Sequence, residues 1–360
     1  MPQEKGIAWS VGNDIVGTFG GLLKLKIRAF ISGCAGTVVT DDEARFFAEF
    51  NPWGLILFKR NCEAPEQIRS LIASYRKAVD RPDAPVFVDQ EGGRVQRIGP
   101  PVWRKYPEAR KFGNLYQINP GLALRAARNI GRLMASELYD LGFTSSCLPV
   151  LDVPQSDSHD VIGNRAYDTR QERIIILANA HVAGLMEGGI LPVMKHVPGH
   201  GRALVDSHHD LPMVTASRHD LEHSDFVPFT ALADLPMAMT AHVIYHAIDA
   251  QNPATLSRKI VRHVIRKVIG FNGLLITDDL SMKALSGSFA QKSQMAYDAG
   301  VDMLLHCNGV MAEMREVGLA ATELSPKTAR RAKAALKLRR KPQPFDEKQA
   351  VDDLEALMTG

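Results

Sequence analysis

A short stretch at residues 194–214, MKHVPGHGRALVDSHHDLPMV, gathers side chains that could transfer protons or bind a metal. Four of the chain's twelve histidines lie in this stretch, together with two aspartates, and glycines flank one of the histidines. Imidazole titrates near neutral pH and is also a common metal ligand, so it suits both kinds of chemistry. Three interpretations must be separated: a metal site, an acid–base site and a solvated loop.

The metal interpretation is the weaker of the two chemical ones. His196 and His200 are four residues apart, which on a helix would place both rings on one face. Pro198 and Gly199 lie between them, however, and proline interrupts a helix. Barrel metallohydrolases also carry a His-x-His pair at the end of the first strand, and the first strand predicted here has no histidine. We therefore expect no bound metal and no other cofactor.

The acid–base interpretation fits the spacing better. Asp206 precedes His208 by two residues, and in an extended loop such residues point to the same side. The carboxylate can then orient the imidazole and stabilise its cation, as the third member of a catalytic triad does. His209 and Asp210 are best explained as solvated loop residues. A second carboxylate would be needed as the nucleophile, and the segment ITDD at 276–279 supplies one.

Short apolar segments that alternate with longer amphipathic ones must position these groups. The predicted strands cover 29–35, 53–58, 85–90, 144–153, 191–196, 237–245, 273–279 and 302–307. Most are rich in Val, Ile and Leu without clean alternation, which is typical of strands covered on both faces. Predicted helices lie between most of them, at 41–50, 64–80, 121–142, 170–189 and 257–270. This order predicts a single-domain α/β fold of the TIM (β/α)8 type.

A doubly wound open sheet is the alternative fold. It would need a glycine-rich phosphate turn after its first strand, and CAGTVVTDD is not such a turn. We predict an N-terminal extension at residues 1–28, a barrel catalytic domain at 29–340 and a C-terminal tail at 341–360. The segment 325–341 has eight basic residues in seventeen, which indicates either an anionic partner or a solvated terminal helix. Of these two interpretations we favour the solvated helix.

Composition excludes several classes of protein. The net charge of +3 and the pI of about 8.6 are too mild to argue for a nucleic-acid or membrane partner. The four cysteines form no CxxC pair, and most lie in strand-like runs, as buried thiols in a reducing compartment do. The apolar stretch IVGTFGGLL is too short to span a bilayer, and the N-terminus lacks the pattern of a secretory signal. We therefore expect a cytoplasmic protein.

Charged residues and histidines recur where the predicted strands end, which is where TIM-barrel enzymes place catalytic groups. In chain order these residues are Asp89, Glu91, Arg94, Arg97, Asp152, Lys195, His196, His242, Asp278, Asp279 and His306. Any one of them could form a structural salt bridge. Because they occur on several strands at once, they predict a functional site at this end of the barrel.

Together these motifs resemble those of glycoside hydrolase family 3, in particular the single-domain bacterial β-N-acetylglucosaminidases of peptidoglycan recycling. The matching segments are WGLILFKRN (53–61), VDQEGGRVQR (88–97), LPVLDV (148–153), GNRAYD (163–168), KHVPGHG with DSHHDLP (195–212) and ITDDLSM (276–282). The chain departs from the family at Val197, where Phe is usual, and at Asn164, where Asp is usual. It also departs at 202–204, where the loop is usually more polar. None of these departures removes a catalytic atom.

The resemblance implies a TIM-barrel enzyme that uses no metal and removes terminal β-linked N-acetylglucosamine with retention of configuration. It implies that Asp278 is the nucleophile and that His208, paired with Asp206, is the acid/base. The sugar-binding residues that it implies are Asp89, Arg97, Arg165, Lys195 and His196. The implied substrate is a small muropeptide, N-acetylglucosamine joined to 1,6-anhydro-N-acetylmuramic acid with or without peptide. We expect a cytoplasmic monomer that acts on it without a nucleic-acid or membrane partner.

Other functions remain open alongside this one. A barrel metallohydrolase would contain a stoichiometric divalent metal. A non-catalytic muropeptide sensor on the same fold would be expected to lack Asp278 or His208, and both are present. A family 3 enzyme of the β-glucosidase type would usually add a second α/β domain, which we do not expect after residue 340.

Overall fold

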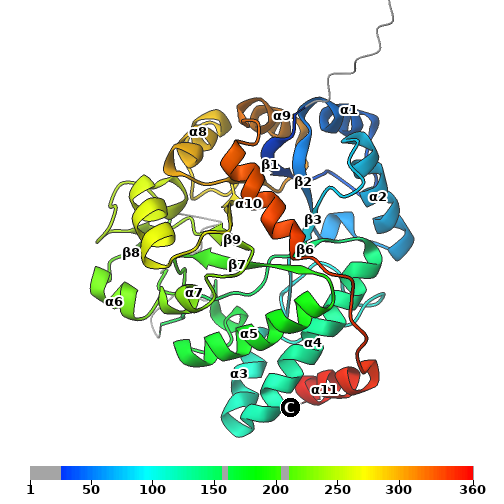
Figure 1. Cartoon of the computed structure of the whole chain (residues 1–360), viewed down its shortest axis with the longest axis vertical. Coiled ribbons are helices and arrows are strands. Elements are labelled where there is room, and N and C mark those ends of the chain that lie inside the picture. Colours follow the sequence, from blue (N-terminus) through cyan, green and yellow to red (C-terminus); the bar gives the residue numbers. More distant parts are fainter. Residues whose placement is uncertain (1–25, 156–160, 204–210, 360) are drawn as a thin grey trace, which may run out of the picture.

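A closed barrel of eight parallel strands forms the centre of the computed structural model, which describes residues 26–155, 161–203 and 211–359 (Figure 1). Around the barrel the order is β1–β12–β11–β9–β7–β6–β3–β2. The strands are β1 (Arg28–Ser32), β2 (Pro52–Leu57), β3 (Val86–Val88), β6 (Ser145–Ser146), β7 (Leu191–Val197), β9 (Met237–Thr240), β11 (Leu274–Asp279) and β12 (Met303–His306). Each corresponds to one of the predicted segments, so the TIM-type fold is confirmed.

Helices surround the barrel and cover its strands (Figure 1). Those predicted from the sequence are present as α1 (Asp41–Phe50), α2 (Pro65–Ala78), α4 (Pro120–Leu141), α5 (Gln171–Glu187) and the π-helix η4 (Ile260–Val268). The described residues also form α3 (Ala109–Ile118), α6 (Arg218–His223), α7 (Val227–Ala231), α8 (Phe289–Ala299), α9 (Met311–Ala320), α10 (Pro326–Lys337) and α11 (Glu347–Thr359). No helix in these residues is long and apolar enough to cross a membrane.

Two of the barrel strands, β6 and β9, are less than half as long as predicted. Strand β6 covers only two residues, and beyond it a single bridge joins Val150 to Lys195. Pro149 lies between the strand and this bridge, and proline has no N–H with which to continue a ladder. Strand β9 ends at Thr240, and the rest of its predicted segment forms β10 (Ile244–Tyr245), which pairs with β8 (Met213–Val214) instead.

The alternation of side chains along each strand creates two apolar layers. On β11, Leu274 and Ile276 point into the barrel, whereas Leu275 packs outward against the helices. Both layers are fully buried, which explains why the strands are apolar without alternating with polar residues. The polar residues are therefore displaced to the strand ends, where they can face a cavity.

Helix α10 closes the amino-terminal end of the barrel, and in Figure 1 it lies across the strands. Its Ala332 and Ala335 are buried in the same interior cluster as Leu274, near the start of β11. Nearby, the buried carboxylate of Asp302 accepts hydrogen bonds from Arg266 and Arg331, at 2.6 and 2.8 Å. The other end of the barrel is left open for a site.

Candidate active site

A cavity of about 250 Å³ lies at the carboxyl ends of the barrel strands. This volume is below the range of about 300–1,000 Å³ common for ligand pockets, which suits a single sugar ring better than a longer chain. Six of the site residues implied from the sequence line it: Asp89, Arg97, Arg165, Lys195, His196 and Asp278. The other two, Asp206 and His208, lie outside the described residues.

A network of paired charges forms one wall of the cavity. Asp89 follows β3 and accepts hydrogen bonds from Lys195 Nζ at 2.8 Å and from Arg97 Nη2 at 3.0 Å. Glu91, in strand β4 (Gln90–Gly92), accepts two bonds from Arg165, both at 2.8 Å. Lys195 also lies 2.6 Å from Glu91, so one lysine joins the two carboxylates. The network fixes three cationic side chains at the cavity wall.

Every member of this network is held in its charged form. Burial alone would raise the pKa of Glu91, but Arg165 and Lys195 outweigh it and lower that pKa to about 2. The pKa of Asp89 is likewise well below its ordinary value, because Lys195 and Arg97 outweigh burial. Burial opposes the charge on Lys195, but the two carboxylates raise its pKa above the ordinary value. The wall therefore presents permanent donors and acceptors to a ligand.

His196 is oriented by a buried carboxylate beneath it. Its Nδ1 lies 2.7 Å from Asp152 Oδ2, and its backbone N–H donates to Asp152 Oδ1 at 3.2 Å. The backbone N–H of His200 donates to the same oxygen at 2.7 Å. Because the carboxylate accepts from Nδ1, the Nε2 atom of His196 is the ring nitrogen left available to the cavity. Asp152, which the sequence placed only at a strand end, is thus a positioning residue.

Asp278 and Asp279 end strand β11, and both line the cavity. The Asp279 carboxylate makes structural contacts, accepting from the backbone N–H groups of Ser281 and Cys307 and from the Ser281 hydroxyl. In the described part of the chain, the only hydrogen bond to the Asp278 carboxylate comes from the Asp279 N–H, at 2.8 Å. Asp278 therefore retains acceptor capacity on the cavity side.

The end of β11 is held in place by His242, another buried strand-end residue. Its Nε2 lies 3.0 Å from the Asp279 carbonyl oxygen, which can only accept, so Nε2 carries a proton. Its Nδ1 lies 2.7 Å from the Thr255 hydroxyl. Burial would raise the pKa of Asp278, but interactions with His242 and His196, the Asp279 N–H and Lys195 lower it below the ordinary value. Asp278 is therefore an ionised, half-buried carboxylate, and the ionised form is the one that can act as a nucleophile.

The sequence-based prediction was wrong about the position of His306 and assigned no role to Glu91. His306 is buried outside the cavity wall, where its ring packs edge-on against Phe289, whereas the next residue, Cys307, lines the cavity. The alternation of strand residues was the signal that could have separated these two. Glu91 was visible in the motif VDQEGGRVQR, but only the structure shows it between Arg165 and Lys195.

Gly199 and Gly201, in the loop after β7, occupy positions that disfavour a side chain. Gly199 has a φ of 139°, and a Cβ atom on Gly201 would lie 2.1 Å from the carbonyl oxygen of Val153. A side chain at either position would therefore displace the backbone that leads toward Asp206 and His208. In the residues with described positions, no cluster of three or more His, Cys, Asp or Glu side chains could hold a metal ion.

Comparison with known proteins yields consistent matches. The model of the glycosyl hydrolase family 3 N-terminal domain matches residues 28–338. A beta-hexosaminidase from Alkalilimnicola ehrlichii is 41% identical over 288 residues, covering 79% of this chain and 82% of the relative. A beta-hexosaminidase from Pseudomonas aeruginosa is 38% identical over 295 residues, covering 81% of this chain and 86% of the relative.

A solved structure resembles the whole barrel. It is NagZ from Neisseria gonorrhoeae in complex with N-trifluoroacetyl-D-glucosamine, with a TM-score of 0.80 and 29% identity. The alignment covers 93% of this chain and 96% of that protein. The similarity therefore includes nearly all elements that position the cavity.

Proposed function

Because the chain belongs to glycosyl hydrolase family 3, we propose that it is a retaining exo-β-N-acetylglucosaminidase that releases terminal β-linked N-acetylglucosamine. The observation that carries this proposal is the ionised carboxylate of Asp278, half-buried at the end of β11 and lining a cavity the size of one sugar. The relatives described as beta-hexosaminidases, and the N-acylated glucosamine in the NagZ complex, support the sugar class.

In the first step, a carboxylate oxygen of Asp278 attacks the anomeric carbon of the sugar. The glycosidic C–O bond breaks, and His208 gives a proton to the departing oxygen, so a glycosyl–Asp278 ester forms. Asp206, two residues earlier, orients the His208 ring and stabilises its charged form. The low pKa of Asp278 supports this step, because the nucleophile is already deprotonated at neutral pH.

In the second step, His208 takes a proton from water while the water oxygen attacks the anomeric carbon. The ester bond to Asp278 breaks, and the two inversions give overall retention. A neutral imidazole suits this role, because it adds no second negative charge beside the glycosyl ester. A conventional retaining enzyme holds two carboxyl groups about 5–5.5 Å apart, and a histidine on a loop relaxes that fixed spacing.

The charged wall supplies the contacts that hold the sugar. Asp89 can accept hydrogen bonds from sugar hydroxyls, and Lys195 and Arg97 can donate to them. The Nε2 atom of His196, which makes no hydrogen bond to the described residues, can add a further contact. Arg165, held by two bonds to Glu91, is placed to donate to a hydroxyl or to the acetamide carbonyl oxygen. Because these groups are fixed before binding, little ordering is required when the sugar enters.

We assign the natural substrate to the muropeptides, N-acetylglucosamine joined to 1,6-anhydro-N-acetylmuramic acid with or without peptide. The enzyme would then act in cytoplasmic cell-wall recycling, as a monomer without a cofactor. This assignment is supported by the family motifs in the sequence and by the small size of the cavity, which fits removal of one terminal sugar.

The direct test compares release of p-nitrophenol from the β-N-acetylglucosaminide and from the β-glucoside. We expect the acetamido sugar to be preferred at least about a hundredfold in kcat/KM, because buried donors left unpaired by the glucoside are costly. Dialysis against a chelator should leave this activity unchanged, which separates the proposal from a metallohydrolase. Equal rates on both glycosides, or no activity on either, would contradict the proposal.

A further inference from the structure

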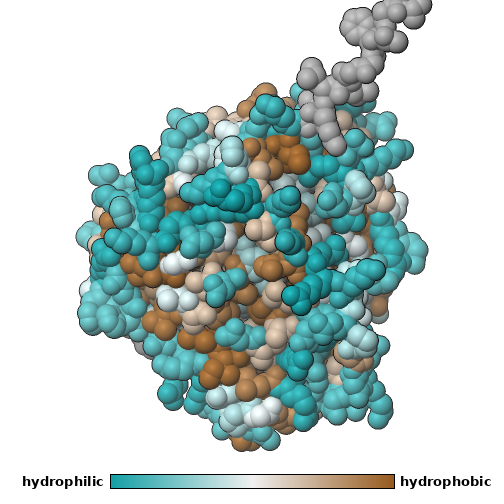
Figure 2. All heavy atoms as spheres, in the orientation of Figure 1, coloured by the Kyte–Doolittle hydropathy of each residue, from teal (hydrophilic) through white to brown (hydrophobic). Residues whose placement is uncertain are grey.

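The amino-terminal end of the barrel concentrates positive charge that the overall composition conceals. The chain has a net charge of only +3, yet residues 325–341 contain eight basic residues and no acidic ones. Without these eight, the remainder of the chain would carry a net negative charge. The charge is therefore unevenly distributed along the chain, and α10 lies in its basic segment. Figure 2 shows hydrophilic side chains over this helix, in the orientation of Figure 1.

The helix separates its basic side chains from its apolar ones. Thr328, Ala332 and Ala335 are buried toward the barrel, at the spacing expected for one face of a helix. The side chains on the opposite face are exposed, and the chain continues past the helix with two further exposed bases. We call this set the basic face; it consists of Lys327, Arg330, Lys333, Lys337, Arg340 and Lys341.

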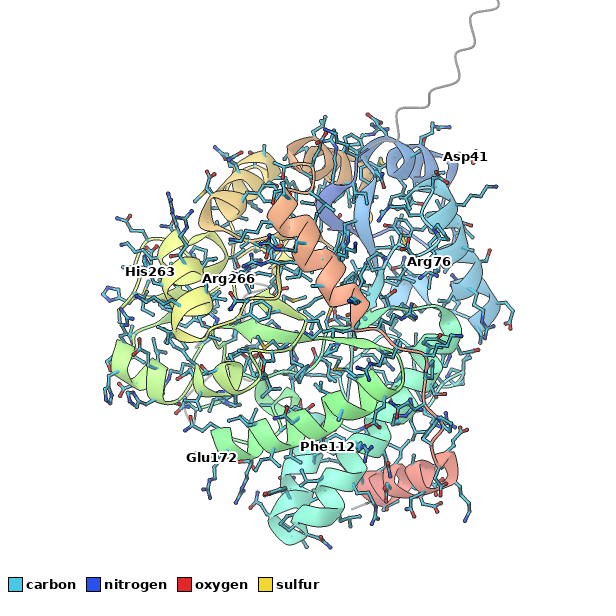
Figure 3. The ribbon with its side chains drawn as sticks, viewed as in Figure 1. Asp41, Arg76, Phe112, Glu172, His263 and Arg266 are labelled. Carbon is cyan, nitrogen blue, oxygen red and sulfur yellow. The ribbon has the colours of Figure 1, made fainter. Side chains whose placement is uncertain are left out.

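Acidic side chains do not neutralise the basic face. Among the described residues, no ion pair within 4.0 Å joins any member of it to a carboxylate. The buried acid Asp302 is already shared by Arg331 and by Arg266 of helix η4. Figure 3 labels Arg266 beside η4. The pKa of Lys327 is lowered, first by Arg331 and then by burial, with Arg266 and Arg262 adding to the effect. The lowered pKa of Lys327 indicates that the surface around it has a positive electrostatic potential.

We propose that the basic face docks this protein on the surface of an anionic phospholipid bilayer. The lysines and arginines of this face are exposed on one side of α10 and just beyond it, so they can approach a flat charged surface together, and polybasic helices bind anionic lipid in this way. A nucleic acid fits less well, because strand binding usually adds exposed aromatic rings for stacking. Two rings close to this segment, Tyr139 and Phe345, are covered by Arg339 and Arg132 instead.

Docking through this face would leave the cavity accessible. The basic face and the cavity lie at opposite ends of the barrel, because α10 packs at the strand starts whereas Asp278 lies at a strand end. The apolar side of α10 is already buried in the barrel core, so attachment would depend on charge rather than on insertion. Binding should therefore weaken strongly as salt is added. This proposal departs from the sequence-based expectation of no membrane partner, which rested on the mild net charge and pI and on the interpretation of the basic segment as a solvated helix.

The test measures binding of the full-length protein to vesicles of phosphatidylcholine, with and without phosphatidylglycerol. The variant Arg330→Gln/Lys333→Gln/Lys337→Gln removes three charges from exposed helix positions at which Gln is well tolerated. The matched control, Arg45→Gln/Lys77→Gln/Lys348→Gln, removes the same charge from α1, α2 and α11. Glycosidase activity of both variants serves as the folding control, because none of the six residues lies at the cavity.

We expect the wild type to bind only vesicles that contain phosphatidylglycerol and to dissociate in high salt. The α10 variant should lose about a hundredfold in partition coefficient, since each basic residue near an anionic surface contributes roughly fivefold. The control variant should lose less than about fivefold, the share of a single such residue. Absence of vesicle binding, or equal losses in the two variants, would overturn the proposal. Tighter binding to an oligonucleotide than to the anionic vesicles would overturn it in favour of a nucleic acid.

Discussion

The two ends of the barrel both contain a buried carboxylate shared by two basic side chains, but they differ in what the pairs leave exposed. At the amino-terminal end, Asp302 joins Arg266 to Arg331 beneath a helix that covers the barrel. At the carboxyl end, Glu91 joins Arg165 to Lys195 along the wall of a cavity. The first arrangement attaches a helix to the barrel, and the second holds donors in position for a ligand.

Because both ends of the barrel contain such ion pairs and the cavity lies at only one of them, a buried ion pair is not by itself a sign of function. A buried charge pair is a poor guide to stability too, because desolvation offsets most of the attraction. What distinguishes the carboxyl end is the presence of an ionised group, Asp278, whose carboxylate is not committed to a structural partner. Substitutions at the carboxyl end should therefore reduce kcat more than the free energy of unfolding. Substitutions at the amino-terminal end should reduce the free energy of unfolding more than kcat.

The largest effect should follow from Asp278→Asn. The amide cannot form the glycosyl ester, so we expect kcat to fall by at least about 10⁴-fold, as for other enzymes that lose a nucleophile. Thermal unfolding should occur at the same or a higher temperature, because a half-buried charge has been removed. The control is Asp220→Asn, an exposed residue of α6. A variant that keeps more than a few per cent of the activity would contradict this assignment.

Asp206→Asn should have the next largest effect. The variant keeps the shape of the side chain but removes the charge that stabilises the His208 imidazolium, and it can select the wrong tautomer. We expect kcat to fall on the order of 10²–10⁴-fold, the range that a positioned acid–base group supplies. Steady-state kinetics on the p-nitrophenyl glycoside measures this, and activity within about twofold of wild type would remove Asp206 from the mechanism.

Glu91→Gln should have a smaller effect on catalysis, because Glu91 acts through Arg165 and Lys195. Loss of the shared carboxylate lets both cations shift, and displacements of about 1 Å can cost on the order of 10²-fold. We expect the loss in kcat/KM to exceed the loss in kcat, since ground-state sugar binding is weakened as well. Glu66→Gln, an exposed change on α2, provides the control. Unchanged KM and kcat would show that the Glu91 pairs are only structural.

Asp302→Asn should affect catalysis least and stability most. Removing one partner from a buried charge cluster commonly destabilises a protein by about 3–5 kcal/mol, because the remaining charges lose their compensation. We expect denaturant unfolding to move to lower concentration, while kcat stays within about twofold of wild type. Asp298→Asn on the exposed face of α8 should change neither. A large loss of kcat in folded Asp302→Asn would contradict the separation of the two ends.

The sequence was sufficient for the barrel because each apolar segment carries its own local signal. The eight strands and five of the helices followed from apolar runs and helical periodicity. The positions of Asp89, Lys195 and Asp278 at the cavity followed from their places at the ends of those strands. These predictions required only the general rule that barrel enzymes place their chemistry at the carboxyl ends of strands.

Other features depend on contacts between distant parts of the chain, which no local pattern encodes. The docking of α10 across the barrel changes the basic segment from an expected solvated helix into a helix with one buried face. The pairing of Glu91 with Arg165 joins residues 74 positions apart. The exclusion of His306 from the cavity depends on which face of β12 points inward. Each of these is fixed by tertiary packing.

The most direct test of the central claim is to trap the covalent intermediate. A slow 5-fluoro glycoside of N-acetylglucosamine, followed by proteolysis and mass spectrometry, should add the mass of one fluorosugar to the peptide that carries Asp278. The Asp278→Ala variant should show no such adduct. If wild-type protein also forms none, and a thiazoline analogue that mimics attack by the substrate's own acetamide inhibits it tightly, then the acetamide rather than Asp278 is the nucleophile.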